Sequence, residues 1–113
     1  MKKIPPDSKT IYQLQAEVCQ CLAHPKRLEV LDILKDREIP ATKLAVRMGI
    51  SKANLSQHLS KMRESGILNS RREGLNIFYS LTNPKVTQAC SLMKEVLREH
   101  LDKQERLRKK IRL

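Results

Sequence analysis

Apolar residues recur at helical spacing in five segments of this chain, and turn-forming residues separate the segments. A capping side chain at Asp7 or Ser8 precedes the first segment. Its apolar stripe comprises Ile11, Leu14, Val18 and Cys21 or Leu22. Pro25, which suits the first turn of a helix, begins a second segment that passes through three leucines to about Asp36. The sequence therefore predicts two amphipathic helices within residues 8–36.

Two shorter helices joined at a glycine are predicted within residues 41–66. A run over residues 42–48 ends at Gly49, where glycine tolerates the positive φ of a helix end. Ser51 caps a second run that ends at Gly66. The inward stripe of this run comprises Leu55, Leu59 and Met62, which leaves its polar residues mostly on the outer face. The pattern predicts a helix-turn-helix.

Residues 67–82 change to a β-hairpin pattern. Two strands are predicted between Leu68 and Leu81, joined by a turn at Glu73 and Gly74, with β-favouring residues on the return strand. A hairpin directly after a helix-turn-helix is the predicted wing.

One long helix is predicted over residues 83–112, with Asn83 as cap and Pro84 at the first position. Its stripe repeats every seven residues and comprises Val86, Cys90, Met93, Leu97, His100, Gln104, Leu107 and Ile111. At 1.5 Å per residue the helix is about 40 Å long, which is more than so small a domain covers alone. Because His100 and Gln104 interrupt the stripe, we expect packing against the first helix as well as against a second chain.

Composition adds a strong positive charge. Lys and Arg number 23 against 12 Asp and Glu, a net charge of +11 over 113 residues, which suits a polyanionic partner. Residues 42–72 carry more than half of it, with seven basic residues against one acidic. A second basic run, residues 106–112, is either a DNA-contacting tail or a solvated helix end. With 40% hydrophobic content, we expect a single domain over residues 1–113.

Several classes of protein are not expected from this sequence. No apolar run reaches the roughly 20 residues of a spanning helix, and no apolar signal segment follows the first basic residues. The three cysteines lack the spacing of a disulfide framework, which fits a reducing compartment where thiols stay free. Neither a Ser-His-Asp set nor a phosphate-binding glycine loop is present, so we expect no enzyme and no cofactor. The expected location is the cytoplasm, without a membrane partner.

The motifs resemble the ArsR/SmtB family of bacterial and archaeal winged-helix repressors over about residues 10–100. The similar runs are LAHPKRLEVL at 22–31, LAVRMGISKANLSQHL at 44–59, GIL at 66–68, RREG at 71–74 and FYSL at 78–81. The resemblance implies a mainly α fold with a small β-wing, in the order α-α-α-α-β-β-α. It also implies a homodimer that joins through its first and last helices and leaves DNA when an inducer binds.

DNA contacts are expected from both the resemblance and the chemistry of the side chains. Asn54 and Gln57 combine a donor and an acceptor, as an adenine edge in the major groove requires. Phosphate contacts are expected from Lys43, Lys52, Ser56, Ser60, Lys61, Arg71 and Arg72. His58, between the outer face and the core, either packs under the wing or touches DNA. The expected partner is double-stranded DNA with an inverted-repeat operator.

The metal sites of the family are not matched in this chain. Residues 41–46, where many members carry Cys-x-Cys, hold no ligand, and the last helix has only His100 with Glu99 and Asp102 nearby. We therefore expect no metal site. The cysteine positions of some sulfur-sensing relatives correspond here to Asp32 and Arg98.

Three thiols remain as candidate sensors: Cys19, Cys21 and Cys90. If the first and last helices meet at the dimer interface, Cys90 would lie near Cys19 or Cys21 and could respond to reactive sulfur, an oxidant or As(III). Alternatively, Cys21 and Cys90 only pack in the core. The sequence thus predicts a repressor released through its thiols. The alternatives are a regulator with another effector and a nucleoid or protein-interaction module without a specific operator.

Overall fold

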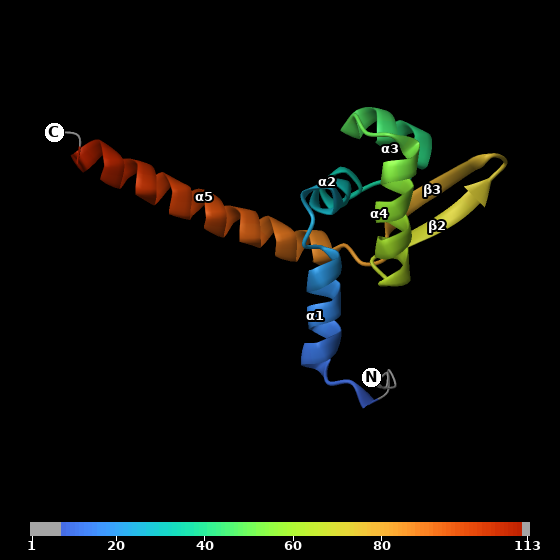
Figure 1. Cartoon of the computed structure of the whole chain (residues 1–113), viewed down its shortest axis with the longest axis horizontal. Coiled ribbons are helices and arrows are strands. Elements are labelled where there is room, and N and C mark those ends of the chain that lie inside the picture. The colour runs from blue at the N-terminus through green and yellow to red at the C-terminus, as the bar shows by residue number, and fades with distance from the viewer. Residues whose placement is uncertain (1–7, 112–113) are drawn as a thin grey trace. The chain divides into compact units, whose positions relative to one another are not determined.

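The computed structural model describes residues 8–111, which fall into two compact units divided between Asn83 and Pro84 (Figure 1). Four helices and a small sheet form the first unit, and one long helix forms the second. The predicted cap at Asp7 and the predicted helix end at Arg112 lie outside the described residues. A single domain over residues 1–113 stays a prediction.

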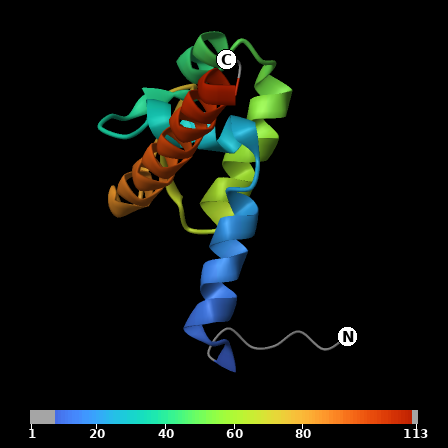
Figure 2. The same cartoon turned by 90° about the vertical axis from the view of Figure 1, so that its left-hand side faces the viewer.

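The helices of the first unit are α1 (Ile11–Cys21), α2 (Pro25–Ile33), α3 (Ala41–Met48) and α4 (Lys52–Glu64) (Figure 2). Helix α1 is capped by Thr10 rather than by Ser8, because Thr10 and Gln13 form a capping box. In this box the Thr10 hydroxyl accepts from the Gln13 N–H and the Gln13 side chain accepts from the Thr10 N–H. Pro25 occupies the first turn of α2 as predicted, but α2 ends three residues earlier than expected.

The joint between α3 and α4 confirms the predicted helix-turn-helix. Gly49 ends α3 in the left-handed conformation with φ of 66°, which an L side chain rarely adopts. The Ile50 N–H then bonds to the Ala45 carbonyl. The Ser51 hydroxyl caps α4 by accepting from the Asn54 backbone N–H at 3.1 Å. Short local interactions therefore fix the angle at which α4 leaves α3.

The sheet has three antiparallel strands in the order β1-β3-β2. They are β1 (Ile39–Pro40), β2 (Leu68–Glu73) and β3 (Asn76–Leu81). The predicted hairpin is present, but the turn lies at Gly74 and Leu75, because Glu73 still pairs with Asn76. Strand β1, absent from the sequence prediction, is only two residues long and pairs with Tyr79 and Phe78.

An aliphatic core lies where α2, α3, α4 and the sheet meet. Its largest fully buried side chains are Val30, Leu31, Leu34, Leu44, Leu55, Leu59 and Met62. The inward stripe predicted for α4 is therefore confirmed. In α1 only Cys21 is buried, whereas Ile11 and Tyr12 are 70% and 78% exposed.

The second unit is α5 (Lys85–Ile111), a helix of 27 residues and about 40 Å. It begins one residue after Pro84, close to the predicted start. Most of its apolar side chains are exposed, with Met93, Leu97 and Leu107 between 50% and 61%. No helix within residues 8–111 is long and apolar enough to cross a membrane.

Candidate nucleic-acid interface

Helix α4 presents its polar face to solvent because its apolar stripe is anchored in the core. Leu55, Leu59 and Met62 are at most 1% exposed, which fixes the rotation of the helix. Asn54 and Gln57 are exposed on α4, and the Ser51 cap engages only the backbone of Asn54. Their amide groups remain available to donate and accept at a base edge.

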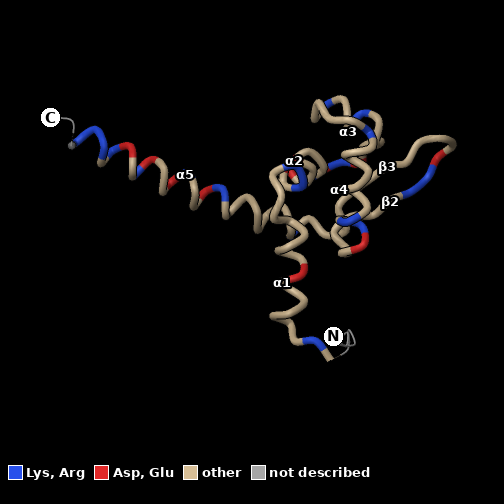
Figure 3. Tube along the Cα trace, viewed as in Figure 1, with Lys and Arg blue, Asp and Glu red and all other residues tan. Residues whose placement is uncertain are grey.

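The residues predicted to contact phosphate lie on α3, α4 and β2. Lys52, Ser56 and Lys61 are exposed on α4, Ser60 is half-buried there, and Lys43 is exposed on α3. The Lys61 ammonium lies 3.9 Å from Glu64, an exposed pair that constrains it little. Figure 3 shows basic residues on α3, on α4 and along β2. All three elements belong to the first unit.

Between α4 and the wing lies a small cavity of about 160 Å³. Lys52 and Ser56 line it from α4, and Ile77 and Tyr79 line it from β3. The polar face of α4 is thus continuous with one face of the hairpin.

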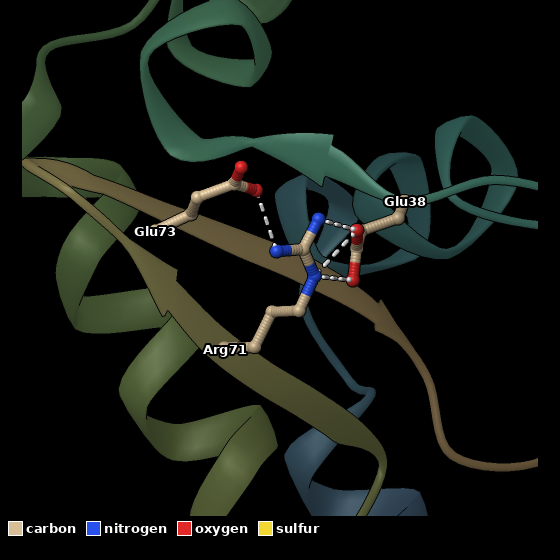
Figure 4. Close-up of polar contacts among 3 residues, drawn as sticks. All are labelled: Glu38, Arg71 and Glu73. Atoms are coloured by element: carbon tan, nitrogen blue, oxygen red, sulfur yellow. Dashed lines mark hydrogen bonds and ion pairs between the residues drawn. The ribbon is translucent and has the colours of Figure 1, made fainter.

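The two wing arginines differ in their surroundings. Arg71 donates to both carboxylate oxygens of Glu38 and to Glu73, as Figure 4 shows. Among the residues that the structure describes, no carboxylate pairs with Arg72, which is exposed. The Glu38 contact was missed by the sequence analysis, because 33 residues separate it from Arg71.

His58 lies against the α1–α2 junction and not under the wing as one sequence alternative proposed. Its Nδ1 accepts from Arg27 Nε at 3.1 Å, and its ring lies 5.9 Å from that of His24. Arg27 also donates to the Cys21 carbonyl at 2.9 Å. Burial, followed by the charges of Arg27 and His24, lowers the pKa of His58 below 6.5. Neutral His58 therefore links α4 to α1 and α2 through Arg27.

The candidate sensor thiols are all free, and their environments differ. Cys19 is exposed, Cys21 is buried and Cys90 is half-buried in the second unit. Arg27 Nη1 lies 3.8 Å from the Cys21 sulfur. Within residues 8–111 no group of three His, Cys, Asp or Glu side chains is placed to hold a metal ion. An approach of Cys90 to Cys19 or Cys21 stays a prediction.

Comparisons with known proteins agree with this geometry. A helix-turn-helix domain family matches residues 22–71. The nodulation protein NolR of Rhizobium meliloti is 31% identical over 90% of this chain and 84% of its own length.

Two solved structures have the same fold. The homodimeric winged helix-turn-helix domain of Mb0332 from Mycobacterium bovis, a possible ArsR-family regulator, is 27% identical with a TM-score of 0.73, covering 89% of this chain and 94% of its own. The transcriptional repressor BigR from Xylella fastidiosa is 34% identical with a TM-score of 0.69, covering 75% and 87%. The chain therefore belongs to the ArsR/SmtB family of winged helix-turn-helix transcriptional regulators, which are DNA-binding proteins and not enzymes.

Proposed function

We propose that this protein is a homodimeric repressor that binds an inverted-repeat operator through α4 of each protomer. The observation that carries this proposal is the outer face of α4, where Asn54 and Gln57 lie exposed above a fully buried stripe. Amide side chains on a helix of this kind fit adenine edges in the major groove. A repressor named among the solved relatives supports the direction of regulation.

Phosphate contacts would hold α4 in register without adding sequence preference. The proposed set is Lys43, Lys52, Ser56, Ser60, Lys61 and Arg72, with Arg71 predicted from the sequence but already engaged by carboxylates. With seven basic residues against one acidic over residues 42–72, the binding would be strongly salt-dependent.

Dimerisation through α1 and α5 is proposed because both helices expose apolar side chains. Ile11, Tyr12 and Leu14 of α1 are 39% to 78% exposed, and six apolar residues of α5 are at least half exposed. A symmetric dimer presents two copies of α4, which matches two inverted half-sites. The homodimeric state of the Mycobacterium bovis relative supports this arrangement.

Induction through thiols is the second part of the proposal. If α1 and α5 pack together in the dimer, Cys90 lies near Cys19 or Cys21. An oxidant that takes two electrons and two protons from such a pair would join the helices by a disulfide. A coupling free energy of about 1–3 kcal/mol between this site and DNA would suffice for release.

The base contacts are tested with single variants on two duplexes. The probes are a duplex enriched by the wild-type protein from a randomised library and a scrambled duplex of the same composition. Asn54→Ala and Gln57→Ala should each lose about 1–3 kcal/mol on the enriched duplex and almost nothing on the scrambled one. Equal losses on both duplexes would show that these amides do not contact bases.

Control of DNA binding by the cysteine thiols is tested by measuring the release of the protein from the enriched duplex. Hydrogen peroxide, polysulfide and arsenite should each be tried against the wild type, Cys90→Ser and Cys19→Ser. Loss of a wild-type response in Cys90→Ser supports the proposal. A response that survives in Cys90→Ser shows that the cysteines pack and that the effector binds elsewhere.

A further inference from the structure

Arg71 and Arg72 are neighbours on β2 but lie on opposite faces of the hairpin. Side chains alternate along a strand, and the register places Arg71 opposite Phe78 and Arg72 opposite Ile77. Ile77 lines the cavity that Lys52 of α4 also lines. The face with Arg72 is therefore continuous with the proposed DNA-binding face of α4. Arg71 lies on the other face.

On that other face two carboxylates already engage Arg71 (Figure 4). Its Nε lies 2.8 and 2.9 Å from the two oxygens of Glu38, and its Nη2 lies 2.6 Å from one of them. Its Nη1 lies 2.7 Å from Glu73, and the guanidinium carbon lies 4.5 Å from the centre of the Phe78 ring. The bonds to Glu38 and then to Glu73 raise the pKa of Arg71 above its ordinary value. All three nitrogens are committed to this cluster.

The cluster lies where the three-stranded sheet becomes a two-stranded hairpin. Strand β1 pairs with β3 only as far as Phe78, so the wing beyond it has no third strand. Two-stranded hairpins are marginally stable alone. Glu38 directly precedes β1, so its bond to Arg71 ties β2 to the α2–β1 connection across β3. The same bonds compensate the charge of Glu73, which would otherwise repel phosphate.

We propose that Arg71 is a positioning residue of the wing and not a phosphate contact. By bridging Glu38 and Glu73 it holds the hairpin so that Arg72, on the opposite face, meets the DNA backbone. This inference rests on the proposed operator binding and replaces the phosphate contact predicted for Arg71 from the sequence.

The salt dependence of binding separates the two roles. Each phosphate contact contributes a slope of about 0.9 in log affinity against log salt, or about 3.5-fold between 50 and 200 mM salt. Arg72→Ala removes one contact per protomer. In the dimer, the ratio of the affinity at 50 mM salt to the affinity at 200 mM salt should therefore fall about 12-fold. Arg71→Ala should weaken binding by up to about fivefold per protomer, the limit for exposed ion pairs, or up to about 25-fold in the dimer, and equally at both salt concentrations. Equal slope losses for the two variants would overturn the proposal.

The two possible roles of Arg71 predict opposite effects of Glu38→Ala on the affinity for DNA. If Glu38 merely competes with phosphate for Arg71, its removal frees the arginine and strengthens binding. If Glu38 anchors the wing, its removal weakens binding although a negative charge is lost. Asp36→Ala is the matched control, because Asp36 is exposed in the same connection and is not among the carboxylates that hold Arg71. We expect Glu38→Ala to bind the enriched duplex about threefold more weakly than Asp36→Ala, and tighter binding would overturn the proposal.

Arg71→Lys keeps the charge but cannot bridge two carboxylates in the geometry of a guanidinium. It should behave like Arg71→Ala, whereas binding equal to wild type would indicate a plain phosphate contact. The slopes are measured on the scrambled duplex as well. If the wild type prefers neither duplex, the proposed function fails, and the slopes on the scrambled duplex still decide the role of Arg71.

Discussion

Leu97→Glu in α5 tests the proposed dimer interface. Leu97 lies in the seven-residue stripe and is 53% exposed in the single chain. The matched control is Gln88→Glu, which changes the charge by the same amount. Gln88 precedes Leu97 by nine residues, and at 100° per residue it lies on the opposite side of the helix.

The apolar contribution of α5 to the free energy of dimerisation follows from its exposed apolar surface. The side chains on the Leu97 side of α5 that are between 50% and 61% exposed are Met93, Val96, Leu97, Leu101 and Leu107. Covering the exposed half of one such side chain contributes about 1 kcal/mol, so two helices contribute about 10 kcal/mol. Association costs about 4–15 kcal/mol, so the exposed residues of α1 are needed as well.

Leu97→Glu acts twice in a symmetric dimer. Over both protomers it removes about 2 kcal/mol of apolar burial. It also adds a desolvation cost of about 2 kcal/mol for each of the two carboxylates. The total of about 6 kcal/mol weakens the dimer about 10⁴-fold.

Sedimentation equilibrium at about 10 μM measures the result. The wild type and Gln88→Glu should have twice the chain mass of 13.1 kDa, and Leu97→Glu should have the chain mass. A dimeric Leu97→Glu variant, or a wild-type monomer that still binds two half-sites tightly, would refute the interface.

Two further predictions concern the first unit. Leu59→Ala, at a fully buried position of α4, should lower the free energy of unfolding by about 2–5 kcal/mol in urea titrations, whereas Val46→Ala, at a position 83% exposed, should change it by less than about 0.5 kcal/mol. Because the pKa of His58 is lowered, the folded protein binds fewer protons than the unfolded chain below pH 6.5, and stability should fall as the pH drops from 6.5 toward the lowered pKa. His58→Gln should flatten this fall, and a pH profile unchanged by the substitution would contradict a pKa lowered chiefly by the burial of His58.

The sequence predicted the helix-turn-helix well because its determinants are local. Gly49 ends α3, Ser51 caps α4 three residues before its bonding partner, and the stripe of α4 follows from helical spacing alone. Such signals involve residues within one or two turns of each other. The polar face of α4 could therefore be assigned before any tertiary contact was known.

Contacts between distant residues gave no such signal. Strand β1 is two residues long and exists because β3 pairs with it. The Arg71–Glu38 and Arg27–His58 bonds span 33 and 31 residues. A run of basic residues in a hairpin suggests phosphate contacts, but only the fold shows which arginine a carboxylate holds.

Recognition of a particular DNA sequence distinguishes the proposed repressor from a protein that binds any duplex. The most direct test compares the affinity of the wild-type dimer for the duplex enriched from a randomised library with its affinity for the scrambled duplex, at one fixed salt concentration near 150 mM. A sequence-specific repressor should prefer the enriched duplex by about 10³-fold or more. A ratio near one would exclude a sequence-specific repressor and identify a winged-helix module that binds DNA through charge alone.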